Sequence, residues 1–167
     1  NRGGTVVYLV ASRNASGTVS AATRCFTDPA GVIDMIAFGD MVACGQQTAV
    51  PVAALADRYP GRILGLGDFS YDVGSAEEFA NCFDPIFGRH RSRIDPIPGN
   101  HEYLTPGAAP YFEYFGAAAG DPATGYYERQ TGNWQILYLN SNCGSVGGCG
   151  VGSPQYTWLA ERLAQAP

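Results

Sequence analysis

Residues 62–72 read "RILGLGDFSYD", and this stretch decides the fold. The apolar run 62–66 has the length and composition of a buried strand. It ends at Gly67 and Asp68, and Tyr71 follows three residues after the aspartate. Glycine lets the chain turn sharply as it leaves a strand. The stretch therefore predicts a buried strand with a carboxylate and a phenol just past its end.

The same pattern occurs twice more, in "IAFGDMV" at 36–42 and in "DPIPGNHEY" at 95–103. Asp40, Asp68 and Asn100 lie 28 and 32 residues apart, which is the length of one strand-helix-strand unit. Right-handed crossovers make such strands parallel, so the three side chains should emerge at one edge of one sheet. A single aspartate at a strand end is usually a turn residue or helix cap. Three polar side chains at this spacing instead favour a hard metal ion bound by oxygen atoms.

The rest of the pattern predicts an α/β fold. Gly99 precedes Asn100 as Gly67 precedes Asp68, and Ser75 with Glu78 predicts a capping box at the start of a helix. The expected strands are 32–38, 62–66 and 94–98, with an antiparallel pair at 125–130 and 133–141. The expected helices are 48–59, 75–87 and 154–164, with a helical turn at 111–116.

Residues 1–27 differ from the rest of the chain in their pattern, which predicts two β-rich strands joined by a turn at 14–17. This segment resembles the last hairpin of a fibronectin type III sandwich. Residues 28–31, "DPAG", read as a linker. We therefore expect two units: residues 1–29, the end of a fibronectin type III-like domain with its linker, and residues 30–167, an α/β domain.

Charge and hydropathy exclude two classes of partner. The net charge of -5 argues against nucleic acid held on a basic face, and no apolar run is long enough to span a membrane. The basic cluster 89–93 is expected to be a solvated helix end, with His90 exposed. All basic residues are arginine, which suggests GC-rich coding and a bacterial source.

The cysteines do not follow the paired spacing of a zinc site. Cys143 and Cys149 flank the flexible segment "GSVGG", so a local disulfide is expected, and a second is expected between Cys44 and Cys82. Cys25 is then left over, either to pair with a segment outside this sequence or to stay free. Disulfides indicate an oxidising compartment and hence a secreted protein.

The GD, GDFSY and GNHEY motifs resemble those of the calcineurin-like metallophosphoesterases, and the tyrosine is similar to that of the purple acid phosphatase branch. The resemblance covers residues 32–167. It implies the amino-terminal half of a two-sheet sandwich flanked by helices, with a fibronectin type III-like unit before it. It also implies a metal-dependent phosphoric ester hydrolase, acting as a phosphomonoesterase on a phosphate ester.

The resemblance further implies a dinuclear centre, of iron with zinc, manganese or a second iron. Asp40 and Tyr71 would bind the first metal, Asp68 would bridge both, and Asn100 would bind the second. The catalytic residues would be His101, as proton donor or as stabiliser of the leaving group, with Glu102 beside it.

The chain departs from the family pattern in two places. Val42 stands where the family commonly has glycine, histidine or cysteine, and the chain holds two histidines although the family needs three further ones after the GNHE motif. The second metal site is thus incomplete, and we expect the 167 residues alone to be inactive and poorly metallated. A missing carboxyl-terminal half or another chain would cover the open sheet. The alternative is a structural or assembly module that performs no chemistry.

Overall fold

The computed structural model describes residues 24–28, 31–132 and 134–165, and the side chains from residue 35 onward. The α/β class is confirmed. The strands are β1 (Arg24–Asp28), β2 (Gly31–Phe38), β3 (Val42–Ala43), β4 (Arg62–Gly65), β5 (Ser70–Tyr71), β6 (Ile94–Pro96), β7 (Tyr127–Thr131) and β8 (Trp134–Tyr138). The helices are α1 (Ala49–Ala56), α2 (Ala76–Glu78), α3 (Asp84–Phe87), α4 (Ala109–Phe115) and α5 (Pro154–Gln165).

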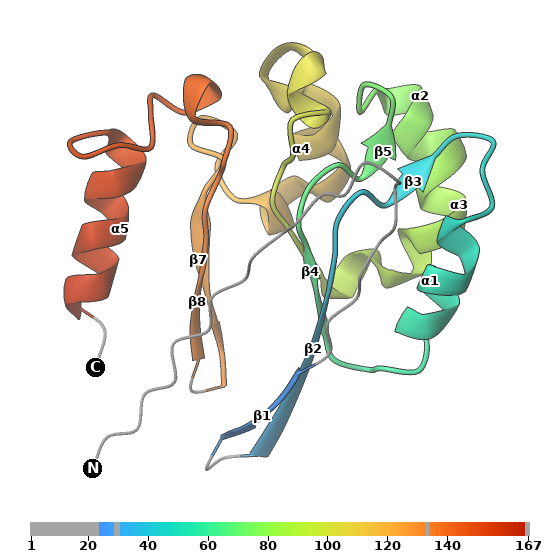
Figure 1. Ribbon diagram of the computed structural model, residues 1–167, viewed down its shortest axis with the longest axis horizontal. Coiled ribbons are helices and arrows are strands. Elements are labelled where there is room, and N and C mark those ends of the chain that lie inside the picture. Colours follow the sequence, from blue (N-terminus) through green and yellow to red (C-terminus); the bar gives the residue numbers. More distant parts are fainter. Residues whose placement is uncertain (1–23, 29–30, 133, 166–167) are drawn as a thin grey trace.

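The main sheet has the order β1-β2-β4-β6, and β2, β4 and β6 run parallel, as the crossover spacing predicted. Phe38 pairs with Gly65, and Gly65 pairs with Pro96, so the three parallel strands end side by side. The short strands β3 and β5 continue this pairing beyond the ends of β2 and β4. The residues that follow the three strands therefore share one edge, which lies at the top of Figure 1.

The fibronectin-like hairpin predicted over residues 1–27 lies, up to residue 23, outside the described residues. Its last part forms β1, which pairs antiparallel with β2. Asp28 and Gly31, the ends of the predicted linker, are paired with each other at the end of this ladder. The described end of the amino-terminal segment thus belongs to the main sheet.

Helices α1, α2 and α3 lie on one side of the main sheet (Figure 1). Residues 76–87 are helical as predicted, but a π-helical turn at Phe79–Phe83 separates α2 from α3. The predicted capping box is confirmed, because Ser75 Oγ accepts from Glu78 N at 3.2 Å and Glu78 Oε2 accepts from Ser75 N at 2.8 Å. The core lies between these helices, α4 and the sheet, where Ile63, Phe69 and Phe83 are completely buried.

The β7–β8 hairpin and α5 lie on the other side of the sheet (Figure 1). An ion-pair cluster joins the two layers. The buried Asp95 of β6 accepts from Arg62 Nε of β4 at 2.9 Å and lies 2.7 Å from Arg129 Nε of β7. Two layers of strands are therefore present in the described residues, although a complete two-sheet sandwich remains a proposal.

The prediction that the basic cluster 89–93 is a solvated helix end is wrong for two of its residues, His90 and Arg93. His90 was expected to be exposed, yet only 6% of it is accessible. Arg93 donates to the carbonyl oxygen of Ala56, the last residue of α1, and to those of Tyr59 and Gly61 just past it. Arginine donors satisfy helix carbonyls that lack partners, so this cluster fixes the end of α1, which is shorter than the predicted helix 48–59.

Candidate metal centre

Tyr71 brings the two aspartates of the sheet edge together. Its hydroxyl donates to Asp40 Oδ1 at 2.5 Å and lies 3.0 Å from Asp68 Oδ2. The phenol has a single proton, so it can donate to only one of the two carboxylates at a time. The negative charge of the other carboxylate is then not compensated by a donor from Tyr71. The sheet edge therefore presents a compact set of hard oxygen atoms, of the type that divalent and trivalent cations prefer.

The backbone near these aspartates is tightly constrained. Asp40 N donates to Gly67 O at 3.2 Å and Met41 N donates to Asp68 O at 2.8 Å, so the two loops remain paired after the strands end. A Cβ on Gly67 would lie 2.6 Å from Gly99 Cα, and one on Gly99 would collide with Asp68 Oδ1. Both glycines are thus needed for close approach of the loops.

Glu102 joins the loop after β4 to the loop after β6. It is fully buried, and it accepts from the backbone N–H groups of Asp68 at 2.9 Å, Phe69 at 2.8 Å and Gly99 at 2.7 Å. Burial raises the pKa of Glu102 above its usual range, while these three hydrogen bonds oppose that rise. Its oxygens are therefore occupied by backbone N–H groups inside the protein, so Glu102 is placed to position its neighbours.

His101 lies directly against Tyr71. Their ring centroids are 4.3 Å apart, and the backbone N–H of His101 donates to Asp68 Oδ1 at 3.0 Å. His101 Nδ1 is hydrogen-bonded to the carbonyl oxygen of Asp72. Since a carbonyl can only accept, Nδ1 carries the proton in this bond, and Nε2 is the atom left to exchange protons. Asn100 is half-buried in the turn between Gly99 and His101, the two residues whose backbones approach Asp68 Oδ1.

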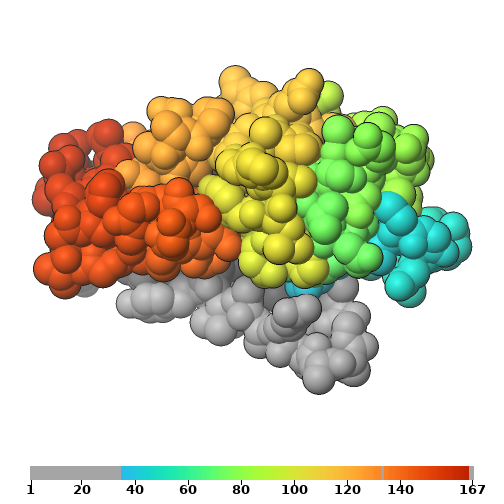
Figure 2. Space-filling view, turned by 90° about the horizontal axis from the view of Figure 1, so that it is seen from above, coloured from blue at the N-terminus to red at the C-terminus, as the bar shows by residue number. Residues whose placement is uncertain are grey.

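Figure 2 views the molecule from above, onto this edge. The segments that follow β2 (cyan), β4 (green), β6 (yellow) and β8 (orange) lie next to one another there. Asp40 is exposed, whereas Asp68 is 9% accessible. Burial, and then the hydrogen bond to Asp40 and the charge of Asp68, raise the pKa of Tyr71 well above its usual value. The phenol is therefore protonated when no cation competes for its oxygen.

Two other residues singled out in the sequence, Val42 and His90, are not exposed at this edge. Val42 pairs with Ser70 and is 1% accessible, so its side chain belongs to the core and supplies no ligand. His90 Nε2 lies 3.3 Å from Ala53 O and 2.9 Å from Asp57 Oδ1, near the end of α1. His101 is therefore the histidine at the candidate site.

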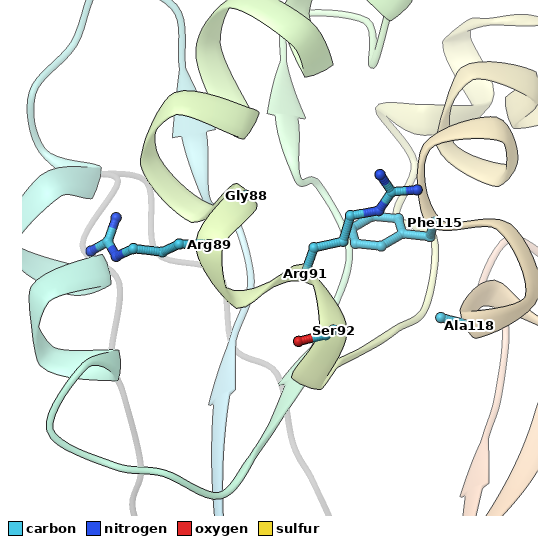
Figure 3. Close-up of a pocket in the computed structure, with 6 residues that line it drawn as sticks. All are labelled: Gly88, Arg89, Arg91, Ser92, Phe115 and Ala118. Carbon is cyan, nitrogen blue, oxygen red and sulfur yellow. The ribbon is translucent and has the colours of Figure 1, made fainter.

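A separate hollow of about 370 Å³ is shown in Figure 3. It is lined by Gly88, Arg89, Arg91, Ser92, Phe115 and Ala118. Residues 88–92 come directly before β6, so the hollow lies near the amino-terminal end of that strand, away from Asn100. Arg89 points away from Arg91 in the figure and pairs with Asp57 at 3.0 Å. The hollow is thus not part of the oxygen-rich edge.

Both predicted disulfides are confirmed. Cys44–Cys82 ties the loop after β3 to the π-helical turn, and Cys143–Cys149 closes the loop after β8, with Cα separations of 5.3 and 5.2 Å. Both distances are usual for disulfides. The side chain of Cys25 lies outside the described part of the chain. The disulfides fit an oxidising compartment, and no helix in the described residues is long and apolar enough to cross a membrane.

Sequence reasoning missed Asn140, which is completely buried at the end of β8. Its Nδ2 donates to Tyr103 Oη at 2.8 Å, and its Oδ1 accepts from Asn142 N at 2.9 Å. A usable signal was present, because "LYLNSN" at 137–142 is another strand that ends in amide side chains.

Within the described residues, no group of three or more histidine, cysteine, aspartate or glutamate side chains could hold a metal ion. The candidate set here is of a different composition: two carboxylates, a phenol and the amide of Asn100. The chain matches no family model, no curated protein and no solved structure. Its function must therefore be argued from the geometry and chemistry of the site.

Proposed function

We propose that this chain carries the metal-binding edge of a metal-dependent phosphoric ester hydrolase that acts on phosphomonoesters. One observation carries the proposal: Tyr71 Oη lies within hydrogen-bond distance of Asp40 and Asp68, which follow two adjacent parallel strands. Ligands and substrates of open α/β sheets are held at this end of the strands. The resemblance of the GDFSY and GNHEY motifs to metallophosphoesterases leads to the same activity.

The donor set fits the first metal better than the second. Asp40, Asp68 and Tyr71 supply three oxygen atoms for one cation, and a cation there would replace the phenolic proton that now lies between the carboxylates. For the second ion, Asp68 and Asn100 are the candidate ligands. The centre that the motifs imply, iron with zinc, manganese or a second iron, would supply Lewis-acid stabilisation of charge on the phosphoryl oxygens.

The surrounding residues have distinct roles in this proposal. As an imidazolium, His101 would donate its Nε2 proton to the leaving-group oxygen and keep the proton on Nδ1, which is held by the Asp72 carbonyl. Glu102 holds the backbone of Asp68 and Gly99 at a fixed separation. The His101 ring packs against Tyr71 and holds the imidazole beside the phenol. The disulfides support placing this protein in an oxidising, extracellular compartment.

The alternative, a structural or assembly module without chemistry, is favoured by one observation. His90 is occupied at the end of α1, so the histidine ligands that the family uses for its second metal have no counterpart among the described residues. Under the hydrolase proposal, the second site would instead receive further ligands from residues outside this sequence, either in the same protein or in another chain that covers the open sheet.

Metal analysis of the purified protein separates the two functions. With its natural neighbouring residues present, the protein should bind metal under the hydrolase proposal, and for iron it should show a visible absorption band from the tyrosine ligand that is lost in Tyr71→Phe. The 167 residues alone should bind metal weakly. Tyr156→Phe is the matched control, because Tyr156 is an exposed tyrosine of α5. A protein that binds no metal and does not hydrolyse a chromogenic phosphate monoester, even with its natural neighbouring residues present, would favour the assembly module.

A further inference from the structure

The loop formed by residues 98–103, called the 98–103 loop below, carries Asn100 and His101, and it is held from two sides. Glu102 binds it to the loop after β4. On the other side lies Asn140, at the end of β8, whose Nδ2 donates to Tyr103 Oη at 2.8 Å. Asn142 Nδ2 donates to Pro98 O at 3.2 Å and to Asn140 Oδ1 at 3.1 Å.

Asn140 is itself fixed from α5. Gln155 Nε2 donates to Asn140 O at 2.9 Å, and Asn140 N donates to Gln155 Oε1 at 2.7 Å. Both residues are buried. With the bonds of its side chain, Asn140 has a partner for each of its polar groups, and a fully satisfied buried network defines a single arrangement.

Gly125 shows that the chain leaves space for this network. A Cβ at Gly125 would lie 2.5 Å from Asn140 Nδ2 and 2.9 Å from Tyr103 Oη, and the backbone there has a φ of +66°. A side chain at position 125 would therefore displace the hydrogen bond between Asn140 and Tyr103. Glycine is required both by this space and by the left-handed backbone.

We infer that Asn140 is a positioning residue for the 98–103 loop. It fixes one end of the loop through Tyr103 and, through Asn142, the other end at Pro98. Between these two anchors lie the proposed ligand Asn100 and the proposed proton donor His101. The role of this position in metal binding rests on the proposed function, whereas its effect on the geometry of the loop does not. Residues that orient metal ligands typically change affinity by about 10- to 100-fold when they are lost.

Hydrogen exchange of one backbone amide can report on the position of the 98–103 loop. The backbone N–H of His101 donates to Asp68 Oδ1, so its hydrogen exchange measures whether the loop stays against the loop after β4. The backbone N–H of Val42 donates to Phe69 O and serves as an internal reference in a neighbouring region without contact to Asn140. Replacing Asn140 itself could prevent folding, because it is completely buried. Tyr103→Phe and Asn142→Ala each remove one anchor and leave Asn140 in place.

The experiment compares these two variants with Tyr156→Phe and Asn81→Ala, which alter exposed residues of the same types. We expect the His101 amide to exchange about tenfold faster in Tyr103→Phe and in Asn142→Ala, with the Val42 amide unchanged. Equal acceleration of both amides would show a merely structural role and would overturn the inference. Exchange of His101 within about twofold of the unaltered protein would overturn it as well.

A Mn²⁺ titration of the same proteins tests the link to the site. The inference expects about tenfold weaker binding in Tyr103→Phe and Asn142→Ala, and unchanged binding in the two controls. Unchanged affinity in all variants, with faster exchange at His101, would overturn the link between the anchors and the metal site. If the unaltered protein binds no metal even with its natural neighbouring residues present, the proposed function fails, and hydrogen exchange alone decides whether Asn140 positions the loop.

Discussion

Asp40 and Asp68 have the same left-handed backbone conformation, with φ values of 52° and 54°. They occupy equivalent positions past β2 and β4, and both lie within hydrogen-bond distance of Tyr71 Oη. This conformation costs a residue other than glycine about 1–2 kcal/mol, although aspartate and asparagine tolerate it best. Two carboxylates held close together in this conformation favour cation binding over stability.

The first prediction concerns the charge of Asp40. Asp40→Asn keeps the backbone preference and the acceptor for Tyr71 but removes the repulsion between two carboxylates. We expect the free energy of unfolding of the metal-free protein to rise by about 0.5–1 kcal/mol, and metal affinity to fall. Urea denaturation and metal titration measure the two effects. In Asp40→Ala the left-handed backbone should instead make the protein about 1 kcal/mol less stable than Asp40→Asn.

The second prediction concerns Glu102. In Glu102→Gln one of the two acceptor oxygens becomes an amide donor that faces backbone N–H groups. Because the site is fully buried, we expect a loss of about 2–3 kcal/mol in the free energy of unfolding. Glu161→Gln, at an exposed position of α5, should stay within about 0.5 kcal/mol of the unaltered protein. Equal stability of both variants would show that Glu102 does not hold the two loops together.

The third prediction concerns pH and His90. Burial lowers the pKa of His90 below its usual 6.5, against the opposing hydrogen bond to Ala53. A group with a depressed pKa in the folded protein takes up its proton more readily when unfolded. The stability that neutral His90 contributes is therefore complete above pH 6.5 and is lost as the pH falls through the lower, folded value.

His90→Gln keeps a donor and an acceptor but does not titrate. The difference in unfolding free energy between the unaltered protein and this variant should shift in favour of the variant as the pH is lowered below 6.5. Taking the difference cancels the carboxylates that both proteins share. A difference that stays constant from neutral to acidic pH would mean that His90 is not held in its neutral form.

The fourth prediction compares the two disulfides. Cys44–Cys82 spans 38 residues and Cys143–Cys149 spans 6, so chain entropy predicts stabilisation of about 4 and about 2 kcal/mol. Paired serine variants of each bridge, measured by urea denaturation, should differ in this order. All the proteins compared should carry Cys25→Ser, so that the Cys25 thiol cannot undergo disulfide exchange with the remaining bridge. A larger loss from the Cys143–Cys149 pair would show that the short loop stabilises through native contacts, such as those of Gln155.

Local patterns in the sequence determined the elements and the edge where the oxygen atoms gather. The spacing of Asp40, Asp68 and Asn100 predicted parallel strands ending side by side, because crossover handedness leaves few other arrangements. The capping box at Ser75 and the short Cys143–Cys149 bridge are also local, since their partners lie within a few residues.

Tertiary structure alone decided which side chains are available at that edge. His90 is in a charged segment that reads as exposed, yet the end of α1 covers it and Arg93. Glu102 follows His101 and resembles a catalytic acid, but backbone N–H groups 33 and 34 residues away occupy its oxygens. Asn140 contacts Tyr103 across 37 residues. Such partners depend on how distant segments pack, because burial and hydrogen bonding are set by neighbours in space and not by neighbours in the chain.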